Sequence, residues 1–467
     1  MLCGMLFAGM VGCGSEKEVV ESVPTLTWYV PGDKQNDQAA VMEEVNKITV
    51  PAIGAKLDIQ FIELGSFQQK MNMVMASGEA FDLCFTGYVN TYSTAAENGG
   101  LLELDDMLDE TPKLKESIPD DVWESARYNG KIYAVPNQQI MATVYAYELD
   151  KELVDKYNFD ANSVTKPEDL EPFLEAVKNG EPEKFAYRTN YGAEMWLHNK
   201  YELYSKLIGI DKETGEIVSV YETPEFKEGS RTLNKWYNNG YIRKDVVSVT
   251  NDSSDYNARR YAVSSKTWKP GLEESFFSSY GYEVVYAKIT APYKTLDFAT
   301  PTMIGIGRKS KYPEKALKLI ELVNTDKELY NLICYGIEGK HYNLDENGQA
   351  EYIDNSGYAP KADWKFGNQF NAYILKGQDS DVWEQTIKLN EEAKVTPLNG
   401  FSIDKTEFLK IYNEVDTANR QCKELMTCSP DDFDAFYQEN IEMLKNAGLD
   451  KLVDNFKQQV EEWKNNR

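Results

Sequence analysis

Tyrosine and tryptophan are the side chains of this sequence whose types point most directly to a binding chemistry. The chain has 30 tyrosines and 8 tryptophans, against 19 phenylalanines. A sugar ring presents apolar C–H faces bordered by hydroxyl groups, so a site for it needs flat aromatic surfaces beside polar groups. The composition therefore permits a saccharide site. The aromatic residues near polar or loop-like sequence, which could equally be core residues, are Trp28, Tyr29, Tyr88, Trp196 and Trp268.

The residues that catalysis would need are mostly missing. The two histidines, His198 and His341, lie outside any HExxH zinc motif, and the sequence has no GxSxG nucleophile turn, phosphate loop or GxGxxG fingerprint. In the stretch YGIEGKHY the glycines favour a turn, and we interpret His341 as tying that turn to a helix. We expect no catalytic residue, metal or cofactor. A glycosidase stays open, because its paired carboxylates need only meet in space.

An apolar run followed by a cysteine opens the chain. Met1 to Val11 is apolar like the core of a secretory signal, and MVGC places small or apolar residues before Cys13. This pattern resembles the lipobox of bacterial lipoproteins, although the usual Lys/Arg-rich start is absent. The resemblance implies cleavage before Cys13, a lipid on its thiol and anchoring at the extracellular face of the cell membrane. Residues 13–24 would then form a lipidated tether.

The other cysteines indicate packing rather than metal binding. Cys84 and Cys334 lie in apolar runs and are expected to be small core residues. Cys422 and Cys428 are close enough in sequence to form a disulfide, which the sequence neither requires nor excludes. The CxxC spacing of a tetrathiolate zinc site is absent.

Length and charge restrict the class of protein. At 467 residues the chain exceeds what one hydrophobic core organises, so two lobes are expected. Acidic side chains outnumber basic ones by 76 to 50, and the net charge of −26 repels phosphate backbones and anionic lipid surfaces. We therefore expect no nucleic-acid partner. No later stretch approaches the roughly 20 apolar residues of a membrane helix.

Strand and helix signals alternate along the first part of the chain, which favours an α/β fold with parallel strands. A capping-box spacing predicts a helix start at Ser66, and glycine predicts its end at Gly78. Asn129-Gly130 predicts a tight hairpin, and helix signals dominate the C-terminal part. The predicted strands are 26–30, 56–64 and 81–85, and the predicted helices include 36–47, 66–78, one from Ser429 to Gly448 and a last one after it.

Several segments, in their order and spacing, resemble a known family over nearly the whole chain. The family is that of the large extracellular solute-binding lipoproteins of bacterial ABC importers, of the carbohydrate-associated family 1 type. Within it, the sequence is similar to a branch with a distinctive helical C-terminal region. The segments that carry the resemblance are Ser77 to Tyr92, Gly99 to Pro112, Val122 to Gln139 and Thr300 to Tyr342.

The resemblance implies a type II periplasmic-binding-protein-like fold, with two α/β lobes, hinge crossovers and a ligand cleft that closes between the lobes. Residues 25–135 and 300–361 would form the first lobe. Residues 136–299 and 362–467 would form the second lobe, with the C-terminal helices. Ligand is expected at the carboxyl ends of the strands, where loops converge.

The loops expected at the cleft wall supply the candidate binding residues. We expect Asn137, Gln138 and Tyr88 to contact ligand first, although residues 137–139 could instead be a hinge whose side chains satisfy backbone groups. Trp236 and Trp463 lie on expected helices and are interpreted as packing anchors. The wall loops are Pro31–Asp37, Gly65-Ser66, Thr86–Tyr88 and Asn137–Gln139, and the further candidates are Glu63, Trp196, Trp268 and Trp28.

Functions from different classes compete at this point. The favoured hypothesis is a non-enzymatic monomer that captures an extracellular oligosaccharide and delivers it to an ABC permease in the membrane. A secreted glycoside hydrolase is the enzyme alternative, and a ligand-binding sensor or adaptor is the third. A peptide or another small solute as cargo would keep the transport hypothesis and change only its ligand.

Overall fold

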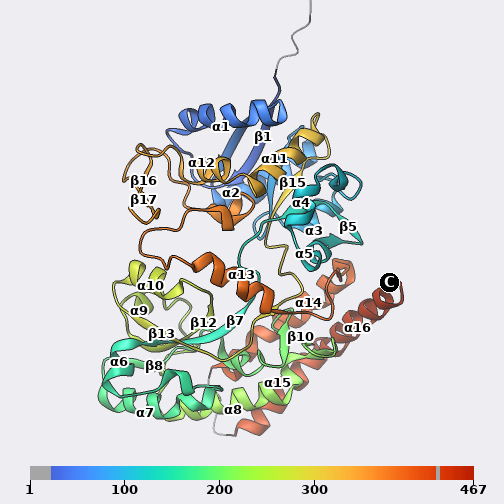
Figure 1. Ribbon diagram of the computed structural model, residues 1–467. Helices are drawn as coiled ribbons and strands as arrows, with labels where there is room; N and C mark the ends of the chain where they lie inside the picture. Colours follow the sequence, from blue (N-terminus) through green and yellow to red (C-terminus); the bar gives the residue numbers. More distant parts are fainter. Residues whose placement is uncertain (1–22, 428–431, 467) are drawn as a thin grey trace, which may run out of the picture.

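The computed structural model describes residues 23–427 and 432–466, which fold into two lobes (Figure 1). The first lobe, in the upper half of the view, contains a sheet with the strand order β2-β1-β3-β15-β6. β1 runs parallel to β2 and β3, whereas β15 is antiparallel to both β3 and β6. The strands are β1 Thr25–Pro31, β2 Lys56–Ile62, β3 Leu83–Gly87, β6 Ala134–Pro136 and β15 Thr302–Ile306.

The predicted alternation of strands and helices at the start of the chain is confirmed, and glycines end the helices as expected. α1 (Gln38–Ile53) stops at Gly54 and α2 (Leu64–Ser77) stops at Gly78, where φ is +63° and +71°. The capping box predicted at Ser66 is wrong. Glu63 is the N-cap of α2, and the Ser66 hydroxyl donates to the Glu63 carbonyl at 3.1 Å from inside the helix.

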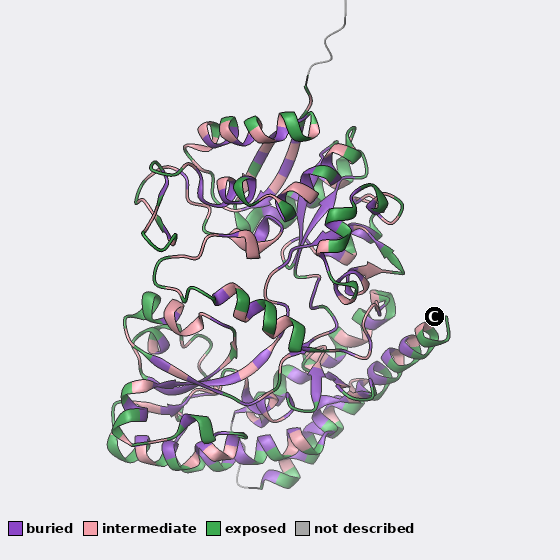
Figure 2. Ribbon diagram, viewed as in Figure 1, coloured by how far each residue is buried: buried purple, intermediate pink, exposed green. Residues whose placement is uncertain are grey.

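Helices cover both faces of the first sheet, and its strands are the most deeply buried part of the lobe (Figure 2). On one face Ile320 and Ile333 belong to a core that includes Trp28, and on the other Phe67 and Met71 pack with Phe85. The other elements of this lobe are α3 Tyr92–Glu97, α4 Pro112–Ser117, α5 Asp120–Ser125, β4 Arg127–Tyr128, β5 Lys131–Ile132, α11 Pro313–Thr325, α12 Lys327–Tyr335, β16 Tyr342–Leu344 and β17 Ala350–Tyr352.

The second lobe combines a mixed sheet of order β13-β7-β12-β8 with a small antiparallel sheet of order β11-β10-β9. Its strands are β7 Val144–Asp150, β8 Phe185–Tyr187, β9 Tyr201–Leu203, β10 Ile208–Asp211, β11 Ile217–Ser219, β12 Tyr261–Trp268 and β13 Val284–Lys288. Its helices include α6 Lys151–Lys156, α7 Glu171–Gly180, α8 Pro224–Asn238, α9 Ser253–Asn257 and α10 Leu272–Tyr280.

The C-terminal helices complete the core of the second lobe. Trp236 is fully buried in this core, and Trp463 packs on its edge, so both act as packing anchors. The predicted start at Ser429 lies outside the described residues. The observed helices are α14 Lys405–Asn419, α15 Phe433–Asn446 and α16 Leu449–Asn465.

Three stretches of the described chain connect the lobes, and they lie side by side. β14 (Tyr293–Lys294) pairs in parallel with β18 (Lys394–Val395), and Tyr293 also forms an antiparallel bridge with Thr143. The Asn390 side chain accepts a hydrogen bond of 2.8 Å from the backbone of Met141, which adds α13 (Val382–Glu392) to the connection. This hydrogen-bonded ribbon is where a hinge between the lobes is expected.

The chain leaves the first lobe later than the sequence predicted. Residues from 362 onward were expected in the second lobe, yet Phe366 and Ala372 are buried in the core of the first. The Phe366 ring meets Trp28 edge-on with 5.7 Å between ring centroids. The segment 362–378 therefore belongs to the first lobe, and α13 follows it between the lobes (Figure 1).

Gly87 offers a test of how tightly the end of β3 is packed. It adopts φ +142°, and a Cβ there would lie 2.0 Å from the carbonyl oxygen of Pro301. We expect Gly87→Ala to lower the free energy of unfolding by about 3 kcal/mol, because two backbone segments would have to separate. Urea unfolding measures this change.

Gly65→Ala is the matched control for this substitution. It lies on the same edge of the sheet, in the first turn of α2, and a Cβ there has nothing within 4 Å. Its effect on the free energy of unfolding should stay within about 1 kcal/mol of zero. Equal effects of the two substitutions would contradict the close packing at Gly87.

Candidate ligand-binding cleft

The carboxyl ends of β1, β2, β3 and β6 meet at the edge of the first sheet that faces the second lobe. Pro31 lies opposite Ile62 at the ends of β1 and β2, and Gly87 lies opposite Thr302. Because β6 and β3 are both antiparallel to β15, they run in the same direction and end at the same edge. The loops predicted to form a cleft wall all begin here.

Three aromatic rings gather at the end of β3 and form what we call the β3 aromatic cluster: Phe85, Tyr88 and Trp364. The ring centroids are 5.9 Å apart for Phe85 and Tyr88, 6.1 Å for Phe85 and Trp364, and 5.8 Å for Tyr88 and Trp364. Tyr88 is 53% exposed although it is a large aromatic residue. The Tyr88 backbone N–H donates to the Pro301 carbonyl at 2.9 Å, which fixes the loop that presents its ring.

A pocket of about 310 Å³ opens beside Tyr88 and is lined by both lobes. The lobes also make direct bonds there, since Lys405 Nζ donates to Ser93 Oγ at 2.7 Å and Ser402 Oγ donates to the Arg127 carbonyl at 3.1 Å. The size of the pocket therefore depends on how the two lobes are arranged. Besides these residues the lining includes Tyr92, Tyr128, Tyr204, Asp297, Pro301 and Phe401.

Of the two basic groups of this pocket, Arg127 is paired with acids, whereas Lys405 is hydrogen-bonded to the Ser93 hydroxyl. Arg127 contacts Asp105 at 2.8 Å and Glu124 at 3.2 Å. Burial lowers the pKa of Lys405, and nearby Glu97 acts in the opposite direction. The pocket therefore combines aromatic surface with polar groups and the acidic Asp297, which suits a polar ligand that carries no negative charge.

Trp268 lies in the second lobe at the end of β12. Its Nε1 donates to Glu273 at 3.1 Å, and Lys288 Nζ lies 3.2 Å from its ring centroid. Burial raises the pKa of the Asp363 carboxyl, and the positive charge of Lys269 partly offsets this. Since Lys269 follows Trp268 and Asp363 precedes Trp364, the two tryptophans come from facing segments of the two lobes.

Asn137 and Gln138 lie at the predicted edge, but their side chains point into the protein. Asn137 is 2% exposed and donates to the Trp364 carbonyl at 3.0 Å, and its Oδ1 accepts no hydrogen bond from the described residues. Gln138 is 8% exposed and donates to Asn324 at 3.3 Å. The geometry matches the alternative of a hinge that satisfies internal polar groups.

Two of the tryptophan candidates pack inside their lobes. Trp28 is 0% exposed in the first core, because β1 is an interior strand, between β2 and β3, and the segment around Phe366 folds against it. Trp196 donates to Glu168 at 2.6 Å and lies 5.7 Å from Trp236, centroid to centroid, in the second core. Both are thereby removed from the cleft wall in this conformation. Glu63 is exposed at the cleft edge, at the start of α2.

Neither histidine is arranged for catalysis. His198 stacks on Tyr145 with 3.4 Å between ring centroids, and burial lowers its pKa to about 3. His341 accepts from the Ile337 N–H at 2.9 Å and contacts Asp37, the N-cap residue of α1, at 3.1 Å, so it ties its turn to a helix as predicted. Across residues 23–427 and 432–466, no cluster of His, Cys, Asp and Glu is placed to bind a metal, and no helix is long and apolar enough to span a bilayer.

The cysteines that the structure describes are buried and free, as the sequence predicted for Cys84 and Cys334. Cys84 and Cys334 are buried free thiols in the core of the first lobe, and burial raises the pKa of each thiol. Cys422 is a buried free thiol in the second lobe. Cys13 and Cys428 lie outside the described residues, so the lipid anchor stays a prediction, and the free thiol of Cys422 gives no support to the disulfide that the sequence left open.

Residues 35–329 match the family described as bacterial extracellular solute-binding protein. The chain belongs to this family. It is 28% identical over 479 residues to a carbohydrate ABC transporter substrate-binding protein of Streptococcus pneumoniae serotype 4, an alignment that covers 99% of this chain and 96% of that one. A two-lobed solute-binding fold is thus established for the chain.

Solved structures agree with this assignment. The N-glycan transport solute-binding protein NgtS from Streptococcus pneumoniae superimposes with a TM-score of 0.82 at 28% identity, over 95% of this chain and 100% of that one. Its complex with Man5GlcNAc superimposes with a TM-score of 0.66 at 27% identity, over 95% and 99%. An extracellular solute-binding protein from Bifidobacterium longum subsp. infantis shares the fold at 16% identity, with a TM-score of 0.67 over 94% and 98%.

In this solute-binding protein, sequence reasoning missed Trp364, Tyr128 and Tyr204. Trp364 lies in the short segment ADWKFGN, whose polar flanks meet the criterion that selected Trp268. The sequence analysis places this segment in the second lobe, away from the strands whose ends form the edge. Tyr128 directly precedes the Asn129-Gly130 turn, and nothing local brings Tyr204 to the same pocket.

A buried carboxyl group of the second lobe lies against two of the crossovers. Glu202 is 3% exposed and accepts a hydrogen bond from the backbone of Leu296, and its carboxylate also interacts with the Thr396 hydroxyl. Burial raises the pKa of Glu202 to about 7, while these two bonds act in the opposite direction. Lys212, whose pKa burial lowers to about 8, donates to the His198 carbonyl nearby at 2.5 Å.

The raised pKa of Glu202 predicts a pH-dependent stability. A carboxyl whose folded pKa exceeds its unfolded value stabilises the fold below the unfolded pKa, and this contribution is lost as pH rises through about 7. Glu202→Gln removes this titration, so its free energy of unfolding should not lose the same contribution as pH rises. Relative to the wild type, the free energy of unfolding of the variant should rise by about 3 kcal/mol from pH 4 to pH 8. Denaturant unfolding at these two values measures the change.

Glu216→Gln serves as the control, because Glu216 is exposed on the same small sheet region. Its stability relative to the wild type should be nearly the same at both pH values. A Glu202→Gln difference that does not change with pH would overturn the assignment of a raised pKa to this carboxyl.

Proposed function

We propose that this protein captures a neutral oligosaccharide between its lobes as the solute-binding subunit of an ABC importer. The observation that carries the proposal is the β3 aromatic cluster at the edge facing the second lobe, with Tyr88 53% exposed beside a pocket lined by both lobes. Aromatic faces and bordering hydroxyl and amide groups are what a sugar ring needs. Trp268 supplies a further ring from the second lobe.

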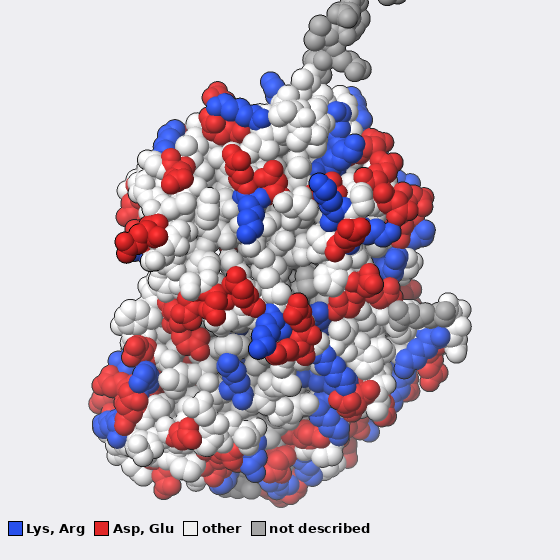
Figure 3. Space-filling model, in the orientation of Figure 1, with Lys and Arg blue, Asp and Glu red and all other residues white. Residues whose placement is uncertain are grey.

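The charges of the protein support a neutral ligand. The net charge is −26, and on the face seen in Figure 3 acidic and basic side chains are interspersed over both lobes. The cations at the pocket, Arg127 and Lys405, already bond to protein groups. A phosphorylated or carboxylated ligand would be repelled at long range by the net negative charge.

Movement of the lobes would complete the site. NgtS superimposes on this chain with a TM-score of 0.82 in the structure described without a ligand, and of 0.69 and 0.66 in its complexes with Man1GlcNAc and Man5GlcNAc. Because the identity is 27–28% in each case, a difference in conformation accounts for the lower scores better than a difference in sequence does. This supports an open form of the present protein, which closes on its ligand by bending at the hydrogen-bonded ribbon between the lobes.

The kind of oligosaccharide follows from the same relative. NgtS binds fragments that contain mannose and N-acetylglucosamine, according to the descriptions of its complexes. We infer that the present protein takes N-glycan-type oligosaccharides of this composition. It would act as a monomer and without catalysis. A lipid on Cys13 would hold it at the extracellular face of the cell membrane, where it would pass its cargo to the permease subunits.

Tyr88→Ala and Trp364→Ala test the cleft. Each substitution should weaken binding of Man5GlcNAc about tenfold, since a tenfold loss corresponds to about 1.4 kcal/mol, within the range that removal of a contacting aromatic ring costs. Isothermal titration calorimetry with the segment from residue 23 onward measures the affinity. Mass spectrometry of the recovered sugar shows whether it is intact.

Tyr312→Ala is the matched control, because Tyr312 is an exposed tyrosine of the first lobe away from the pocket. It should leave the affinity unchanged. Hydrolysis of the sugar would replace the proposal with a glycosidase. Binding of peptides instead of sugars would retain transport and change the cargo, and uptake that survives deletion of the gene would favour a sensor.

A further inference from the structure

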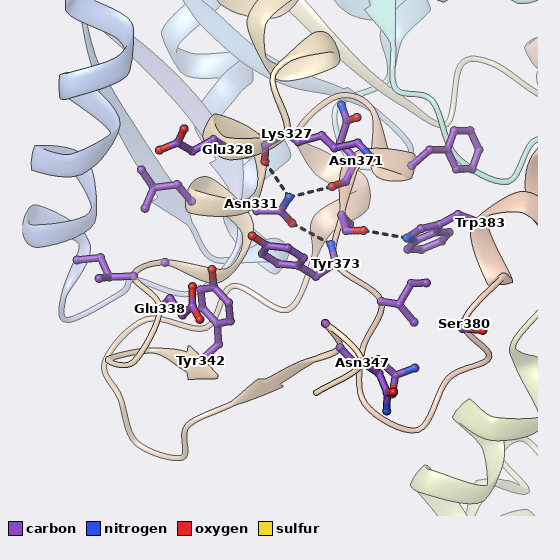
Figure 4. A pocket seen from close by; sticks show the side chains of 18 of the residues that line it. Lys327, Glu328, Asn331, Glu338, Tyr342, Asn347, Asn371, Tyr373, Ser380 and Trp383 are labelled. Carbon is purple, nitrogen blue, oxygen red and sulfur yellow. Dashed lines mark hydrogen bonds between the residues drawn. The ribbon is translucent and has the colours of Figure 1, made fainter. Parts of the chain in front are cut away.

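A second and larger cavity, of about 1070 Å³, lies on the first lobe and shares no lining residue with the cleft pocket (Figure 4). Its walls come from α1, α12, the turn between β16 and β17, the segment 370–374 and the start of α13. α1 and α12 cover one face of the first sheet, whereas Phe85 and Tyr92 at the cleft belong to the core on the other face. The cavity is therefore separate from the cleft.

Aromatic rings line this cavity in two pairs. Tyr342 and Tyr373 lie 5.7 Å apart between ring centroids, and Phe370 and Trp383 lie 6.2 Å apart. Figure 4 shows Tyr342 and Tyr373 on one side of the cavity and Trp383 on the other, with Asn371 between them. Because Tyr373, Phe370 and Trp383 are only partly buried, their surfaces remain open to a ligand.

Internal hydrogen bonds hold these rings in place. Asn331 donates to the carbonyls of Lys327 and Asn371, both at 2.8 Å, and accepts from the Tyr373 backbone N–H at 2.8 Å. Trp383 Nε1 donates to the Ala372 carbonyl at 2.9 Å. These bonds fix the rings relative to the first lobe before any ligand arrives, which lowers the entropy that binding would cost.

The polar groups of the cavity suit a neutral ligand. Amide and hydroxyl side chains, among them Asn347, Gln349 and Ser380, supply donors and acceptors. The ionisable lining residues are Glu44, Lys47, Lys327, Glu328, Glu338 and Glu384, in which acids outnumber bases. The Glu44–Lys47 pair is closed at 2.7 Å, so anionic ligands would meet a net negative wall.

We propose that this cavity is a second carbohydrate-binding site, on the flank of the first lobe, which takes a neutral oligosaccharide. Paired aromatic surfaces flanked by amides are the same chemistry that recognises sugar rings in general. The site does not require closure of the lobes, because Trp383 is bonded to the first lobe through Ala372. The inference goes beyond the proposed function and stands or falls separately from it.

The experiment uses ligand-detected saturation-transfer NMR with Man5GlcNAc, on protein in which Trp364→Ala weakens binding at the cleft. We expect the sugar still to receive saturation from this variant. Adding Trp383→Ala should reduce that signal at least fivefold, whereas adding Trp383→Phe, which keeps a ring, should preserve most of it. A signal that is absent from Trp364→Ala protein, or unaffected by Trp383→Ala, overturns the second site.

A further variant guards against a simple folding defect. Ser380 is exposed at the cavity, so Ser380→Trp fills the space without removing a packed ring, and it should cause the same loss. If Trp383→Ala abolishes all binding and Trp364→Ala none, the cleft proposal fails and this one holds. If tetralysine rather than the sugar gives a Trp383-dependent signal, the cavity recognises cations and the saccharide assignment is wrong.

Discussion

The parallel pairing of β14 with β18 is the contact on which the arrangement of both lobes depends. Tyr293 lies beside Lys394 and also bridges to Thr143, so strands that leave three different parts of the chain are joined at one place. The buried Lys294 extends this joint to the first lobe through a 2.6 Å contact with Asp121. A joint this narrow permits rotation of the lobes while it prevents their separation.

The same constraint explains where the binding chemistry accumulates. The crossovers leave from the carboxyl edge of the first sheet, and the close contact of Gly87 with Pro301 holds that edge together. The segment that carries Trp364 lies beside the crossover residues Asn137 and Gln138. The Asn137 side chain donates a hydrogen bond to the Trp364 carbonyl. Asn137, which was expected to bind ligand, thus supports the backbone that presents the Trp364 ring. The aromatic surface at this edge comes from Tyr88 and Trp364 instead.

Sequence reasoning recovered what local patterns determine. The alternation of strands and helices in the first lobe, the glycine ends of α1 and α2 and the turn at His341 depend on neighbours within a few residues. Trp28 and Trp364 show the limit of prediction from local sequence patterns. Both are tryptophans near polar sequence, but Trp28 is buried because Phe366, far along the chain, packs against it. Only the tertiary pairing of distant segments decides which of the two rings faces the cleft.

The position of β15 has a consequence for the order in which the protein is built. β15 lies between β3 and β6, and among the described strands of that sheet β6 pairs only with β15. During synthesis the first sheet must wait with an open β3 edge until residues 302–306 emerge, while β7, β8, β12 and β13 are already complete. The β3 edge of the lobe that begins the chain is therefore unpaired while the strands of the other lobe are made, and it is exposed to wrong partners meanwhile.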